Sequence, residues 1–240
     1  DTERVLGTDH PNTLNTRNNL AGAHQQAGDL AQAIPLFEAT LTDCERVLGT
    51  DHPDTLNIRN NLAFAYHEAG DLAQAIPLFE ATLADRERVL ETDHPDTLNS
   101  RHNLAGAYGD VGDLAQAIPL LESTLADRER VMETDHPGTL ATRNNLAFAH
   151  HEAGNLAQAI PLFKANLADC ERILGTDHPY TLNTRNNLAG AHQDAGDTKK
   201  AIPLFEAILA DCERLLGNDH PSTLVARANL DAARNDLDHI

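Results

Sequence analysis

The tripeptide Asp-His-Pro returns every 42 residues along the chain. It begins at Asp9, Asp51, Asp93, Asp135, Asp177 and Asp219. Self-similarity at a fixed period is the signature of a repeat architecture, in which each unit packs mainly against its neighbours. We therefore expect residues 1–240 to form a single elongated array without one central core.

The period divides the chain into five complete units and two partial ones. The complete units are residues 9–50, 51–92, 93–134, 135–176 and 177–218. Residues 1–8 match residues 43–50, so we interpret them as the end of a truncated repeat, which indicates a piece of a longer protein. Residues 219–240 are half a unit and carry Asp231 where the other units place alanine, so we expect a C-terminal capping helix there.

Each complete unit is predicted to contain two helices separated by a Gly-Asp turn, and residues 51–92 are representative. Pro53 suits the first position of a helix, and the residue before a proline avoids helical angles, so the first helix should start there. Packing positions then recur at spacings of three and four, the period of an amphipathic helix, at Leu56, Arg59, Leu62, Ala63, Tyr66 and Ala69. Gly70 suits the left-handed residue that ends this helix, and Asp71 suits the cap of the next.

The second helix is expected to run to about Leu90, with Pro77 inside it. The same proline recurs in every complete unit, at Pro35, Pro119, Pro161 and Pro203. Proline removes a backbone hydrogen bond from a helix, so either the helix bends at this residue or it starts late. The sequence leaves both alternatives open.

These units resemble the tetratricopeptide repeat. Leu62-Ala63-x-x-Tyr66 followed by Ala75-x-x-x-Phe79 is similar to the family pattern Leu-Gly-x-x-Tyr and Ala-x-x-x-Phe. The 42-residue period, with NNLA in the first helix and AIPLF in the second, resembles the kinesin light chain type. The resemblance implies an all-α, right-handed α-solenoid that serves as a non-catalytic scaffold for protein interactions.

The chain departs from the family pattern at one packing position. Arginine stands where a large apolar residue is expected, at Arg17, Arg59, Arg101, Arg143, Arg185 and Arg227. The apolar stem of arginine can pack while its guanidinium reaches a carboxylate. We therefore expect the fold to be kept, with a more polar seam between helices.

Asparagines occupy the face of the first helix opposite its packing residues. One position is asparagine in every unit, including Asn19, Asn61, Asn103, Asn145 and Asn187, and the preceding position is asparagine at Asn60, Asn144 and Asn186. By resemblance, this is where tetratricopeptide domains grip the main chain of a peptide in a concave groove. An amide offers donors and acceptors, so we predict a peptide-binding ladder. The alternative is that the amides bond neighbouring helices and only keep the groove soluble.

An aromatic residue is predicted beside this ladder in two units, at Phe64 and Phe148. The equivalent position in the other complete units is glycine, at Gly22, Gly106 and Gly190. Exposed aromatic residues often contribute most of the energy of an interface, so both residues are candidate anchors. The alternative is that each ring folds over a neighbouring glycine to fill space.

Composition argues against other classes of partner and site. The formal net charge of −19, with only three lysines, argues against nucleic acid and membrane as partners. No zinc-binding helix motif, phosphate loop or catalytic constellation stands out, so we predict no metal, no cofactor and no enzymatic activity. Cys44, Cys170 and Cys212 share one repeat position, too far apart to pair, which favours a reducing compartment and a cytoplasmic protein.

Two further roles stay open from the sequence. The partner in the groove is either another protein or a segment of the same parent chain, which would make the array a sensor or autoinhibitory arm. Alternatively, near-identical units with an open N-terminal half-repeat could self-associate as a structural module.

Overall fold

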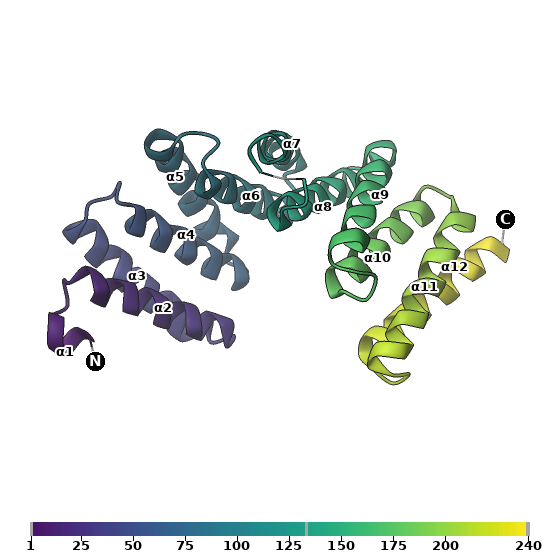
Figure 1. Cartoon of the computed structure of the whole chain (residues 1–240), viewed down its shortest axis with the longest axis horizontal. Coiled ribbons are helices and arrows are strands. Elements are labelled where there is room, and N and C mark those ends of the chain that lie inside the picture. The colour runs from purple at the N-terminus through teal and green to yellow at the C-terminus, as the bar shows by residue number, and fades with distance from the viewer. Residues whose placement is uncertain (1, 133, 239–240) are drawn as a thin grey trace. The chain divides into compact units, whose positions relative to one another are not determined.

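The computed structural model describes residues 2–132 and 134–238, and this part of the chain is built from α-helices joined by short turns (Figure 1). In chain order they are α1 (Thr2–Leu6), α2 (Pro11–Gln26), α3 (Leu30–Val47), α4 (Pro53–Glu68), α5 (Leu72–Leu90), α6 (Pro95–Asp110), α7 (Leu114–Val131), α8 (Pro137–Glu152), α9 (Leu156–Ile173), α10 (Pro179–Asp194), α11 (Thr198–Leu216) and α12 (Pro221–Asp238). We call the even-numbered helices, which start at the Asp-His-Pro proline, A helices. The odd-numbered helices from α3 to α11 are B helices.

The helices form two compact units, divided between Leu120 and Leu121 within α7. In the first unit, α2 to α6 pack consecutively, and each A helix also contacts the next A helix along the chain. In the second unit, α8 to α12 pack consecutively, and α8 also contacts α10. Each unit is therefore a stack of helix-turn-helix repeats, as the period predicts.

Each residue of the Asp-His-Pro motif has its own role at the start of the A helix α4. Pro53 is the first residue of α4, and the His52 Nδ1 atom accepts a hydrogen bond of 3.2 Å from the Asp54 backbone N–H. Asp51 accepts two hydrogen bonds from the Arg88 guanidinium at the end of α5, at 2.6 and 2.9 Å. The sequence predicts the role of the proline, but the histidine cap and the arginine partner emerge only from the structure.

The turn between A and B helices matches its prediction. The structure also excludes one of the two alternatives for the proline of the B helix, namely a late start of the helix. Gly70 has a φ of 76°, in the left-handed region, and the Asp71 side chain caps α5 by accepting from the Gln74 backbone N–H. The B helix α5 begins at Leu72 with Pro77 inside it, so the late start is wrong. The helical period predicts Ala69 as a packing residue, which is wrong, because Ala69 is the exposed C-cap of α4.

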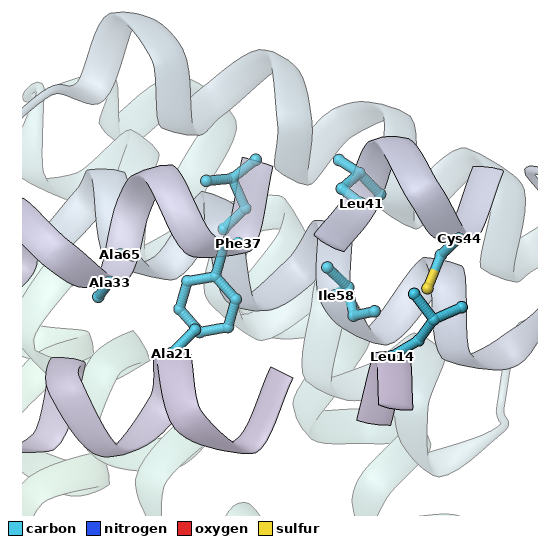
Figure 2. Packing of buried hydrophobic residues seen from close by; sticks show 9 residues of the cluster. Leu14, Ala21, Ala33, Phe37, Leu41, Cys44, Ile58 and Ala65 are labelled. Carbon is cyan, nitrogen blue, oxygen red and sulfur yellow. The ribbon is translucent and has the colours of Figure 1, made fainter. Parts of the chain in front are cut away.

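Aromatic and aliphatic side chains of A and B helices form the core between repeats. In the first unit, Phe37 of α3 is fully buried, and its ring points toward Ala21 of α2 (Figure 2). Cys44, further along α3, lies beside Leu14 in the same cluster (Figure 2). The cysteine thus serves as a small packing residue.

The arginine seam is confirmed. Arg59 is buried on α4, and its guanidinium bonds Asp85 of α5 at 2.6 Å and Glu45 of α3 at 3.3 Å. Arg143 and Arg185 repeat this arrangement with carboxylates from the B helices on either side. Each arginine therefore ties one A helix to two B helices.

Arginine also replaces the packing cysteine in two repeats, at Arg86 and Arg128, and both side chains are buried. Arg86 donates to the Ser100 hydroxyl at 2.7 Å and to the Asn57 side-chain oxygen at 2.6 Å, rather than to a carboxylate. Burial lowers the pKa of both guanidinium groups. The repeats that carry Arg86 and Arg128 therefore have buried polar contacts at the position where other repeats have a cysteine.

Candidate binding surface on the A helices

The predicted ladder residues lie together on one side of the A helices, which we call the A-helix face. In the first unit this face belongs to α2, α4 and α6. In the second unit it belongs to α8, α10 and α12. Asn19 is exposed, and the others are partly exposed: Asn60, Asn61, Asn103, Asn144, Asn145, Asn186 and Asn187. On α4, Leu62 and Ala63 are buried on the opposite side. The polar and packing faces are therefore separated as the helical period predicts.

The ladder asparagines are hydrogen-bonded from one A helix to the next. In the first unit, Asn61 Nδ2 donates to Asn18 Oδ1 at 3.1 Å, and Asn103 Nδ2 donates to Asn60 Oδ1 at 3.4 Å. In the second unit, Asn187 donates to Asn144 and Asn229 donates to Asn186. Asn18 was not among the predicted site residues, although the Asn-Asn pair at 18 and 19 repeats the pair at 60 and 61.

These bonds fix the orientation of the amides and leave part of each amide unused. Among the described residues, the side-chain oxygen of Asn61 accepts no hydrogen bond. The side-chain oxygen of Asn60 accepts one from Asn103, but the amide nitrogen of Asn60 donates no hydrogen bond to the described residues. A primary amide has two N–H donors and an oxygen acceptor. Helix α4 therefore presents a free donor on Asn60 and a free acceptor on the adjacent Asn61, which is what a peptide unit needs.

Phe64 forms one wall of a pocket on this face. The pocket has a volume of about 290 Å³ and is lined by Gly22, Gln25, Gln26, Phe37, Asn61, Phe64 and Glu68. Phe64 is 40% exposed and stacks on His67 at a centroid distance of 6.0 Å. A Cβ atom added to Gly22 would meet no other atom within 4 Å, so the space above this glycine is open.

The second unit repeats part of this arrangement. Phe148 is 49% exposed, and its ring lies 6.4 Å from that of His151. The space above Gly190 on the next A helix is also open. The two aromatic residues thus have the same exposed setting beside a histidine.

Side chains at the ends of the A helices join neighbouring A helices. His67 bonds Asp110 at 2.6 Å and Gln25 donates to Glu68 at 2.7 Å in the first unit. His151 bonds Asp194 at 2.7 Å in the second. These contacts hold the A helices side by side and place carboxylates along the edge of the asparagine face.

A second pocket lies elsewhere in the second unit, at the starts of α8 and α10. It measures about 360 Å³ and is lined by Asp135, Pro137, Leu140, Ile173, Leu174, His178 and Tyr180. The Tyr180 hydroxyl donates to the Leu140 carbonyl at 3.0 Å. None of the predicted site residues lies in this pocket.

The three cysteine side chains are buried in the packing between helices. Cys44, Cys170 and Cys212 are free and buried, and burial raises the pKa of the Cys44 thiol to about 11. Over residues 2–132 and 134–238, no three histidine, cysteine or acidic side chains gather as a metal site. Within the same ranges, no helix has the length and apolar character needed to cross a membrane.

Comparison with known families and structures gives a consistent result. The tetratricopeptide repeat model matches residues 2–42, 16–87, 54–130, 103–165, 138–210 and 183–230. A kinesin light chain-like protein of Podosopora anserina with nearly identical TPR-like repeats is 31% identical, with a TM-score of 0.75 over 86% of this chain and 98% of that one. A search of curated proteins found no match.

More distant structures share the fold. BtubC (BKLC) from P. vanneervenii is 19% identical, with a TM-score of 0.75 over 87% of this chain and 83% of that one. The apo form of RapI is 11% identical, with a TM-score of 0.74 over 91% and 82% of the two chains. Tetratricopeptide repeats generally mediate interactions between proteins, and proteins of this kind are typically scaffolds rather than enzymes. The chain belongs to the tetratricopeptide repeat family, and its repeats are of the kinesin light chain-like type.

Proposed function

We propose that the chain is a scaffold that binds an extended segment of a partner protein along the A-helix face. The observation that supports this most is the pair of unused amide groups on Asn60 and Asn61 of α4, next to an open pocket. An amide donor and acceptor in fixed orientation can hold a peptide backbone with little dependence on its sequence.

The aromatic residues supply selectivity in this proposal. Phe64 lies beside the open space at Gly22, where an apolar side chain of the partner would insert. Aromatic residues in such settings often contribute most of the binding energy. Carboxylates such as Glu68 and Asp110 at the edge of the face favour a partner with basic or amphipathic character. Three free, buried thiols fit a reducing compartment such as the cytoplasm.

A peptide display selection tests the proposal. The wild-type protein is the bait, and the counter-selection uses a variant with Asn61, Asn103 and Asn145 changed to alanine. Alanine is a better helix former than asparagine, so this variant should stay folded. Each neutral hydrogen bond contributes about 0.5–1.5 kcal/mol, so selected peptides should bind the variant at least about tenfold more weakly.

A matched variant removes the same number of amides from another face. Gln32, Gln74 and Gln116 lie exposed at the starts of three B helices, and their change to alanine should leave peptide affinity unchanged. The proposal is refuted if no peptide is enriched by the folded protein, or if both variants lose affinity equally.

A further inference from the structure

The pocket beside Phe64 has an aromatic part and a polar part. Two phenyl rings line it, Phe37 of α3 and Phe64 of α4, and the polar part includes Gln25 of α2 and Glu68 of α4. Pockets that enclose a whole small molecule usually measure about 300–1,000 Å³. At about 290 Å³, this pocket has the size for one long side chain of a bound segment.

Glu68 brings a negative charge to this pocket, and no basic side chain in the described part of the chain pairs with it. Its Oε2 atom accepts a hydrogen bond of 2.7 Å from the amide of Gln25, which is neutral. The carboxylates at the equivalent position of two other A helices, Asp110 and Asp194, instead bond a histidine. Glu68 is exposed, so it keeps its charge and can still bind a cation from a partner.

The unused acceptors of the pocket match the donors of arginine. Within residues 2–132 and 134–238, neither Glu68 Oε1 nor Gln25 Oε1 accepts a hydrogen bond. Arginine carries five N–H donors in a planar fork, whereas lysine carries three on a single nitrogen. The guanidinium plane also stacks on aromatic rings, and Phe64 provides such a ring. The pocket therefore suits arginine better than lysine.

We infer that this pocket binds an arginine side chain of the partner segment. The inference rests on the proposed function and makes it more specific, because arginine is then the side chain that enters the open space at Gly22. Its methylene stem is the apolar part that packs against Phe64, and its guanidinium bonds Glu68. Asn61 lines the same pocket and stays available for the main chain of the segment. The net charge of −19 adds attraction for a cationic partner.

The second unit contains a similar carboxylate without the aromatic ring. Gln193 of α10 donates to Asp236 of α12 at 2.7 Å, as Gln25 donates to Glu68 in the first unit. Ala232 stands on α12 at the position that Phe64 has on α4. Asp236 is also exposed, so it is a matched control that carries the charge but not the ring.

Four pools of fluorescent nonapeptides test the inference. The central residue is arginine, lysine, citrulline or norleucine, and the flanking positions carry an equal mixture of alanine, serine, threonine and leucine. Citrulline has the shape of arginine without its charge, and norleucine has only an apolar stem. Each pool is titrated with the folded protein, and anisotropy is recorded. We expect the arginine pool to bind about fivefold or more tightly than the citrulline and norleucine pools, with the lysine pool between them.

Two variants and one control locate the binding at the pocket. Glu68→Gln keeps the shape and removes the charge, so the preference for arginine over citrulline should fall below about twofold. Asp236→Asn changes the net charge equally and should leave this preference unchanged. Gly22→Leu fills the open space and should weaken binding of the arginine pool by about fivefold. Leucine is a better helix former than glycine, so this variant should stay folded.

The possible outcomes separate this inference from the proposed function. Equal binding of the four pools to the wild type, lost in the asparagine variant described above, would overturn the inference and leave the proposed function intact. Equal changes in arginine preference from Glu68→Gln and Asp236→Asn would also overturn it, because the attraction would then come from net charge. If no pool bound to the wild type, the inference and the proposed function would both be overturned.

Discussion

Substitution of Phe79 by alanine lowers the free energy of unfolding by about 3–4 kcal/mol, the usual cost of emptying a buried phenylalanine site. Phe79 is 1% exposed on α5 and packs in a cluster with Leu83, Leu104 and Tyr108. Because the neighbouring helices are held by their own contacts, the space left by the ring cannot close completely. Urea denaturation followed by circular dichroism measures the change.

Phe64 provides the control for this prediction, because it is also a phenylalanine but is 40% exposed. Its change to alanine should alter the free energy of unfolding by less than about 1 kcal/mol. Equal losses at the two positions would contradict the division of the repeat into a packing side and an open A-helix face.

Substitution of Arg143 by alanine should have the next largest effect. The Arg143 guanidinium bonds Asp169 of α9 at 2.6 Å and Glu129 of α7 at 3.0 Å, and the side chain is 8% exposed. Removal of one member of a buried ion pair costs about 3–5 kcal/mol, but these carboxylates keep some solvent contact, so we expect about 2–3 kcal/mol. Methionine at this position should lose less than alanine, because it restores the packing of the stem.

Arg172 is the matched comparison, because it also bonds Asp169 but lies at the surface. Its guanidinium holds the pKa of Asp135 below the usual value through two hydrogen bonds. Both groups are solvated and screened, so the change of Arg172 to alanine should leave the midpoint of urea denaturation almost unchanged. A loss at Arg172 as large as that at Arg143 would contradict the role assigned to the seam.

The repeat period carries most of the information about the fold. Pro53 at the helix start, Gly70 at its end and Asp71 at the next cap follow from local backbone chemistry, so they can be read from the sequence. The path of the chain at Pro77 depends on packing around the helix and could not be predicted. The partnership of Asp51 with Arg88 joins residues 37 apart, although their recurrence in several units was a usable signal.

The candidate site was predictable to the level of a helix face. The helical period places Asn61 and Phe64 opposite Leu62, but it does not say how one A helix meets the next. The bond from Asn61 to Asn18, and the open pocket at Gly22, depend on that distance and angle.

Photo-crosslinking of a selected peptide tests most directly whether the A-helix face holds the partner. A benzophenone amino acid is placed at Phe64 on α4 or, as the comparison, at Val89 on α5, and the two positions are 40% and 39% exposed. The proposal predicts a crosslinked product from position 64 and little from position 89, and unlabelled peptide should compete for it. Equal crosslinking at the two positions, or crosslinking only at position 89, would contradict binding along the A-helix face.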